Sequence, residues 1–168
     1  MGFVRKTALP LWLLGWGAEF LLADMSHLLA LLFHQGVLDE QFLHLRQLQD
    51  ETSPNFVYEV TSIYFRESEN LLMNLKLLLT EKEHSDYTKI KVHVNQIMGS
   101  SSSIGANRIR NACVAFRAVS DQHNRVGCLR ALELLEKEYN YLKNKLHEFF
   151  QIEQQRSLAA RARYPLPN

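Results

Sequence analysis

The sequence contains little of the residues that cross-link or interrupt a protein chain. Its 168 residues include two cysteines, four prolines and seven glycines. Two cysteines do not make the disulfide framework of a small secreted domain, and both lie in helical patterns, so we expect reduced thiols in a cytosolic protein. Proline and glycine end helices, and their scarcity favours long helices in one domain that can bury a core without metal or disulfide support.

An excess of charge of one sign is also absent. Lysine and arginine together number 19, and aspartate and glutamate together number 18, so composition gives no electrostatic reason to expect nucleic-acid binding. The seven histidines are scattered without the spacing of metal ligands, and no catalytic triad, phosphate-binding loop or zinc pattern occurs. The sequence therefore predicts no enzyme activity, no cofactor and no metal site.

Residues 1–23 contain an apolar run, but it is too short to cross a membrane. A membrane-spanning helix needs about 20 apolar residues, and Pro10 and Gly15 interrupt this run. Arg5 and Lys6 precede it, which is the outline of a signal peptide. We interpret residues 1–23 as an atypical apolar N-terminal extension that forms an amphipathic first helix without membrane binding; a secretory leader is the alternative.

The rest of the chain has an apolar pattern with a helical period almost throughout. Capping residues, glycine and proline divide this pattern into helices of about residues 28–33, 39–51, 54–79, 86–105, 106–119 and 124–155. Long helices joined by short polar links predict an all-α protein, an antiparallel four-helix bundle with two short helices packed at one end. We expect the bundle domain to comprise residues 24–156 and residues 157–168 to be a disordered tail.

The fourth expected helix has the most unusual composition. Helical spacing divides its side chains into a buried stripe, Ile90, Val94, Ile97 and Ser101, and an exposed stripe, Lys91, Asn95, Met98 and Ser102. Gly99 and four consecutive serines are poor helix formers, which together cost about 3 kcal/mol relative to alanine. Such small residues let a neighbouring helix approach the buried side or let a partner dock around Asn95.

This segment resembles the signature of the plant histidine-containing phosphotransfer (HPt) proteins of two-component signalling. That signature is His-x-x-Lys-Gly followed by Ser-Ser-Ser-Ser-Ile-Gly-Ala. Residues 99–106 match it throughout, but Asn95 stands in place of the phospho-accepting histidine and Met98 in place of the lysine. Further blocks keep the family's order and spacing at residues 35–42, 48–51, 111–117 and 127–132. The resemblance covers about residues 28–156 and is to the pseudo-HPt subgroup, which lacks the histidine.

The two replacements remove the groups that phosphoryl transfer needs. Neutral imidazole is a nucleophile, whereas the amide lone pair of Asn95 is delocalised, so this side chain can form hydrogen bonds but cannot carry a phosphoryl group. Met98 does not supply the cation that the family's lysine would place beside the phosphoryl oxygens. His93 lies about 200° around the helix from Asn95 and is badly placed to substitute as the acceptor.

The resemblance implies a catalytically silent monomer in the cytoplasm and nucleus, acting in the His-to-Asp phosphorelay of cytokinin signalling. It would bind receiver domains of hybrid sensor histidine kinases and response regulators without accepting phosphate, and so act as a competitive negative regulator. The expected binding surface comprises Asn95, Met98, Gly99, Ser102, Gln41, Phe42 and Leu45. For the last three, burial in the core is an equal alternative. Two other functions stay open, a working phosphorelay mediator and a secreted helical-bundle ligand.

Overall fold

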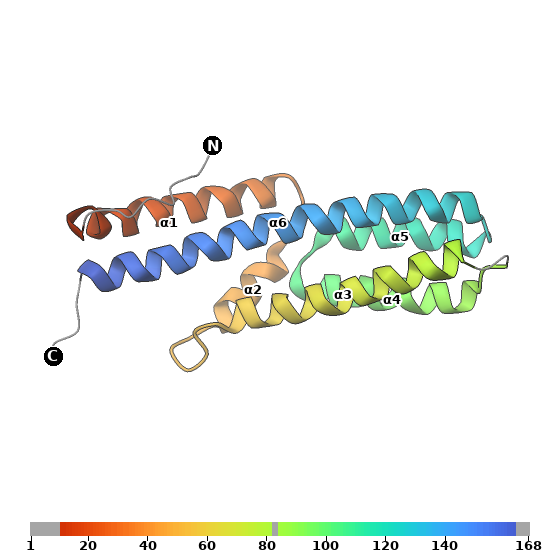
Figure 1. Ribbon diagram of the computed structural model, residues 1–168, viewed down its shortest axis with the longest axis horizontal. Helices are drawn as coiled ribbons and strands as arrows, with labels where there is room; N and C mark the ends of the chain where they lie inside the picture. Colours follow the sequence, from red (N-terminus) through yellow and green to blue (C-terminus); the bar gives the residue numbers. More distant parts are fainter. Residues whose placement is uncertain (1–10, 82–83, 164–168) are drawn as a thin grey trace. The chain divides into compact units, whose positions relative to one another are not determined.

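The computed structural model describes residues 11–81 and 84–163, and its regular elements in these ranges are six α-helices. They are α1 (Leu11–His34), α2 (Glu40–Leu48), α3 (Phe56–Thr80), α4 (Tyr87–Ile104), α5 (Asn107–Asp121) and α6 (Arg125–Arg163), labelled in Figure 1. The predicted all-α class is confirmed. The chain divides into two compact units, one of residues 32–144 and one of the described parts of 1–31 and 145–168.

The 32–144 unit contains the four-helix bundle. Within it, α3, α4, α5 and the first part of α6 run side by side in alternating directions (Figure 1). Each helix contributes a fully buried side chain to the core, for example Leu75 of α3, Ile97 of α4, Phe116 of α5 and Leu135 of α6. The predicted stripe of α4 is confirmed, since all four of its residues are buried. Apolar burial on this scale is the main force that holds the bundle together.

Residues at both ends of α4 fix its length. The Asp86 carboxylate accepts the Lys89 backbone N–H at 3.1 Å, which caps the first turn as the sequence predicts. Gly105 ends the helix in the left-handed region, with φ of 81°. A Cβ atom there would lie 2.6 Å from the Phe42 backbone nitrogen, so only glycine allows this close approach of α2. Its carbonyl accepts the Asp39 N–H at 2.9 Å, which ties the start of α2 to the end of α4.

The third helix begins later than the sequence suggested. The sequence predicts a start at about residue 54, whereas α3 starts at Phe56. The Asp50 carboxylate accepts hydrogen bonds from the backbone of Thr52 and Ser53 and so holds these residues in a separate turn. The Thr52 hydroxyl, followed by these backbone groups, lowers the pKa of Asp50. The turn that Asp50 stabilises therefore prevents α3 from starting at Ser53 or Pro54.

The first and last helices are both longer than predicted. α1 is one helix of 24 residues rather than a short helix near residue 28, and it includes residues 11–23 of the predicted extension. Residues 1–10 lie outside the described range. α6 continues to Arg163, so the expectation of a disordered tail is wrong for residues 157–163, where leucine and alanine favour a helix. Residues 164–168 are not among those described.

The second unit is formed by α1 up to Leu31 and by α6 from Lys145 onward. Its buried side chains include Met25, Leu28, Leu29, Leu146, Phe149 and Ala159. In the described part of the chain, none of the helices has the length and apolar character that crossing a membrane requires.

Candidate functional site

The exposed side of α4 provides the candidate site. Asn95, Gly99 and Ser102 are exposed and Met98 is half-buried, which agrees with the predicted stripe. A Cβ atom placed on Gly99 would meet no other atom within 4 Å. The absence of a side chain at Gly99 therefore serves no contact with a neighbouring helix. Of the two explanations for this small residue, close packing against a neighbouring helix does not apply at Gly99.

The four serines after Gly99 satisfy their hydroxyl groups within the protein. Ser100 donates to the Gln96 carbonyl at 3.0 Å, Ser102 to the Met98 carbonyl at 2.9 Å and Ser103 to the Ser100 carbonyl at 2.8 Å. These hydroxyls fold back onto the helix backbone, so they do not project as fixed donors toward solvent. The serine side chains therefore protrude little from the surface of α4 beside Asn95.

Ser101 is the serine that points into the core. Its hydroxyl lies 2.7 Å from the Tyr64 hydroxyl on α3, and both groups are buried. Burial raises the pKa of Tyr64, so this phenol stays neutral at physiological pH. The pair is a buried polar link between α3 and α4, behind the exposed face.

Only one of the three residues predicted on α2 is accessible. Gln41 is half-buried and donates from Nε2 to the Ser103 carbonyl at 3.3 Å, which places it beside the end of α4. Phe42 is 0% exposed and Leu45 is 8% exposed, so their side chains belong to the core and not to a binding surface. Leu48, which follows Leu45 by three residues, is by contrast 63% exposed.

The exposed side of α2 contains two residues that the sequence reasoning did not select. His44 Nδ1 lies 3.3 Å from Gln41 Oε1, and Leu48 follows one helical turn later. Gln41, His44 and Leu48 are spaced i, i+3, i+7, which puts them on one side of a helix. This spacing is visible in the sequence, but spacing alone does not tell which side of α2 the rest of the bundle covers.

His93 does not replace the missing acceptor. Its side chain is half-buried, and its Nδ1 atom is buried without a hydrogen-bond partner among the described residues. The exposed nucleophile that phosphoryl transfer needs is therefore not supplied by this ring.

Both cysteines are free thiols, as predicted, and the structure places both of them in the interior. Burial raises the pKa of Cys113 to about 12, and it also raises the pKa of Cys128. Within residues 11–81 and 84–163, no group of three or more His, Cys, Asp or Glu side chains is arranged to hold a metal ion. Around Asn95, the exposed α4 face offers an amide, a thioether and small residues.

Comparison with known proteins identifies the family. Residues 59–145 match the family model described as the Hpt domain. A relative from Arabidopsis thaliana, pseudo histidine-containing phosphotransfer protein 6, is 67% identical over 154 residues, which cover 92% of this chain and 100% of the relative. This chain belongs to the HPt family. Because the chain belongs to this family, the alternative of a secreted helical-bundle ligand no longer applies.

Other HPt proteins support the same assignment. Histidine-containing phosphotransfer protein 1 of Arabidopsis thaliana is 47% identical, over 74% of this chain and 80% of that protein. The crystal structure of an HPt protein from Medicago truncatula is 40% identical, with a TM-score of 0.80 over 84% of this chain and 95% of that one. A maize HPt protein gives a TM-score of 0.76 at 35% identity, over 80% of this chain and 98% of that one. The predicted HPt-like fold is confirmed.

Within the HPt family, the chain is a pseudo-HPt protein of the plant phosphorelay. The family signature places Asn95 at the position of the phospho-accepting histidine, and α4 exposes this residue to solvent. Such a protein takes part in signalling as a relay component rather than as a catalyst.

Proposed function

We propose that this pseudo-HPt protein binds receiver domains of hybrid sensor histidine kinases and response regulators without accepting phosphate from them. The binding surface, which we call the docking face, comprises Asn95, Met98, Gly99 and Ser102 of α4 together with Gln41 of α2. The observation that carries the proposal is the open space over Gly99, where an added Cβ would meet nothing within 4 Å. An exposed helix surface with open space over Gly99 suits close approach by another protein.

The chemistry of the docking face supports a silent role. Asn95 can donate and accept hydrogen bonds, but its amide is not a nucleophile. Met98 offers a polarizable apolar contact where the family has a cation. Phosphoryl transfer depends on a positioned nucleophile and on charge stabilisation. A receiver could therefore bind here while its phosphoryl group finds no acceptor.

A silent binder regulates the phosphorelay by competition. It occupies receiver domains that a functional HPt carrier would otherwise use, and so it acts as a negative regulator, which in the cytokinin pathway would operate in the cytoplasm and nucleus. At equal affinity and concentration, each competitor holds about half of the bound receiver. Effective inhibition therefore needs greater abundance or tighter binding than the functional carrier has. We expect the protein to act as a monomer.

The test is incubation of the purified full chain with a receiver domain that carries a radiolabelled phosphoryl group. We expect the receiver to be retained on the immobilised protein while no acid-labile label moves to it. A functional HPt protein treated in parallel serves as the positive control for transfer. Label carried stably on any residue of this chain would contradict the proposal and support the alternative of a working phosphorelay mediator.

A further inference from the structure

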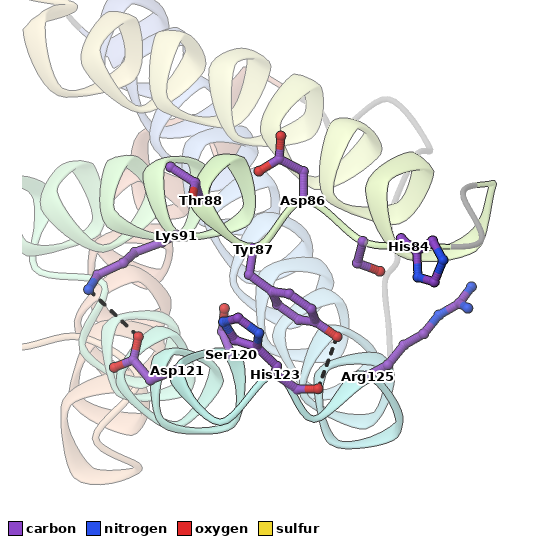
Figure 2. Close-up of a pocket in the computed structure, with 10 residues that line it drawn as sticks. His84, Asp86, Tyr87, Thr88, Lys91, Ser120, Asp121, His123 and Arg125 are labelled. Atoms are coloured by element: carbon purple, nitrogen blue, oxygen red, sulfur yellow. Dashed lines mark hydrogen bonds and ion pairs between the residues drawn. The ribbon is translucent and has the colours of Figure 1, made fainter.

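One side of α5 contributes charged residues next to the docking face. Lys91 Nζ on α4 lies 3.6 Å from the Asp121 carboxylate at the end of α5, and Figure 2 shows this ion pair beside a pocket at the start of α4. Lys91 belongs to the same exposed stripe of α4 as Asn95. The side of α5 that contains Asp121 is therefore adjacent to this exposed stripe.

Four residues of α5 share this side of the helix, because they are spaced i, i+4, i+7 and i+11. They are Arg110, Val114, Arg117 and Asp121, and we call them the α5 flank. Arg108 lies on the opposite side of α5, where it donates to the Glu138 carboxylate of α6 at 2.7 Å. The α5 flank therefore faces α4 rather than α6.

The pairing of α4 with α5 places Arg117 at the level of Asn95. The two helices are consecutive and run in opposite directions (Figure 1). Asn95 lies four residues after Lys91, and Arg117 lies four residues before Asp121. From the ion pair, both steps run about 6 Å in the same direction, at the usual rise per residue. Arg110 lies about 10 Å further along α5.

The positive charge of the α5 flank is not neutralised by carboxylates. Among the described residues, no ion pair includes Arg110 or Arg117, and Arg110 donates instead to the neutral Asn111 Oδ1 at 3.1 Å. The sequence of α4 contains no aspartate or glutamate, and that of α5 contains only Asp121, which Lys91 engages. The two helices therefore present net positive charge beside the docking face, which favours an anionic group on the partner.

The chemistry of Arg117 suits a phosphoryl group. Its side chain is half-buried, and an arginine in such a place packs its aliphatic stem against the protein while its guanidinium group stays in water. The planar guanidinium presents N–H donors in a fork that matches the oxygens of a phosphate. This cation lies at the level of Asn95, the position where the family signature has the phospho-accepting histidine.

We propose that Arg117 contacts the phosphoryl group of a phosphorylated receiver domain, so that the docking face binds this form more tightly than the unphosphorylated form. The inference rests on the proposed function, because it requires the receiver to bind around Asn95. A phosphoryl group adds negative charge and acceptor oxygens to the receiver's aspartate, and charge-assisted hydrogen bonds to such oxygens are strong. The protein then withholds from the relay mainly those receivers that carry phosphate.

The experiment measures the affinity of the immobilised full chain for a response-regulator receiver domain by surface plasmon resonance. The receiver is applied with Mg²⁺ alone and with Mg²⁺ and beryllium fluoride, which forms a stable phosphoryl mimic on its aspartate. We expect beryllium fluoride to lower the dissociation constant about tenfold, the gain expected for a hydrogen bond between charged groups. Equal affinity, or tighter binding of the unmodified receiver, would overturn this inference and leave the proposed function standing. Absence of binding of either form would overturn both.

Variants of the α5 flank test the assigned contact. Arg117→Gln removes the charge but keeps most of the aliphatic stem, and it should abolish the preference for the beryllium fluoride form, which Arg117→Lys should partly restore. Arg110→Gln is the matched control, since it removes an equal charge about 10 Å away on the same flank and should weaken both receiver forms alike. Circular dichroism checks the fold of each variant. A preference that Arg117→Gln retains, or that Arg110→Gln abolishes equally, would refute the assignment of Arg117.

Discussion

Asn95 and Met98 differ from the family signature in ways that a pair of substitutions can reverse. Asn95→His restores an imidazole nucleophile on an exposed position of α4. Met98→Lys restores a cation, and the half-buried position suits lysine because its aliphatic stem can lie along the surface while the ammonium group reaches water. Neither change removes a core contact, so we expect stability to change little.

We predict that the Asn95→His, Met98→Lys double variant accepts phosphate from a phosphorylated receiver, at least in part. Asn95→His alone should accept less, because an exposed charge contact contributes about 1 kcal/mol, or several-fold in equilibrium. Acid-labile label on the variant, compared with the unmodified chain, measures the gain. A folded double variant that binds receivers but takes no label would show that the two residues do not account for the silence.

Gly99 allows a direct test of the docking face. Gly99→Glu fills the open space over α4 and should weaken receiver binding, while the helix should gain up to about 1 kcal/mol because glycine is a poor helix former. Surface plasmon resonance measures the affinity and thermal unfolding measures the stability. Gly99→Gln is the neutral control that separates size from charge. If both variants bind receivers with unchanged affinity, the docking site lies elsewhere.

The buried Tyr64 and Ser101 pair is the specific polar link between α3 and α4. We predict that Tyr64→Phe lowers the free energy of unfolding by about 1–3 kcal/mol, since it leaves the Ser101 hydroxyl buried without a partner. Adding Ser101→Ala removes that hydroxyl and should recover most of the loss. Urea unfolding of the two single variants and the double variant gives the coupling. Strict additivity would mean that the hydrogen bond contributes nothing to the pairing of the helices.

The helical pattern of the sequence predicted most of the helices and their ends. The buried stripe of α4 and its ends at Asp86 and Gly105 all follow from spacing and capping chemistry. The start of α3 did not, because the Asp50 side chain stabilises a turn that competes with the helix for Ser53. The end of α6 was also missed, since no proline or glycine stops the helix before Arg163.

The candidate site was predictable on α4 but less so on α2. One helix pattern cannot tell which apolar residues the rest of the bundle covers, and so Phe42 and Leu45 stayed ambiguous until the structure placed them in the core. The pocket beside the start of α4, lined also by Asp121, His123 and Arg125, was not predictable, because its residues come from separate segments that only packing brings together.

At the scale of the whole molecule, the proposed function is competition, and it makes a quantitative prediction. In a reconstituted relay of kinase, functional HPt protein and response regulator, this chain should reduce phosphate flow in proportion to its occupancy of receivers. Raising the concentration of the functional HPt protein should restore the flow, as mass action requires. Inhibition that excess functional carrier cannot relieve would contradict simple competition.

The burial of both cysteines has a practical consequence for measuring the stability of the 32–144 unit. Cys113 and Cys128 are fully buried, and their raised pKa values keep the thiols protonated, so an alkylating reagent cannot reach a thiolate in the folded state. Modification requires a local or global opening, and its rate reports the free energy of that opening. We predict slow alkylation of the native chain, followed by mass spectrometry, and rapid alkylation in denaturant. The native thiols thereby provide a built-in probe of opening, without an introduced cysteine, in every variant proposed above.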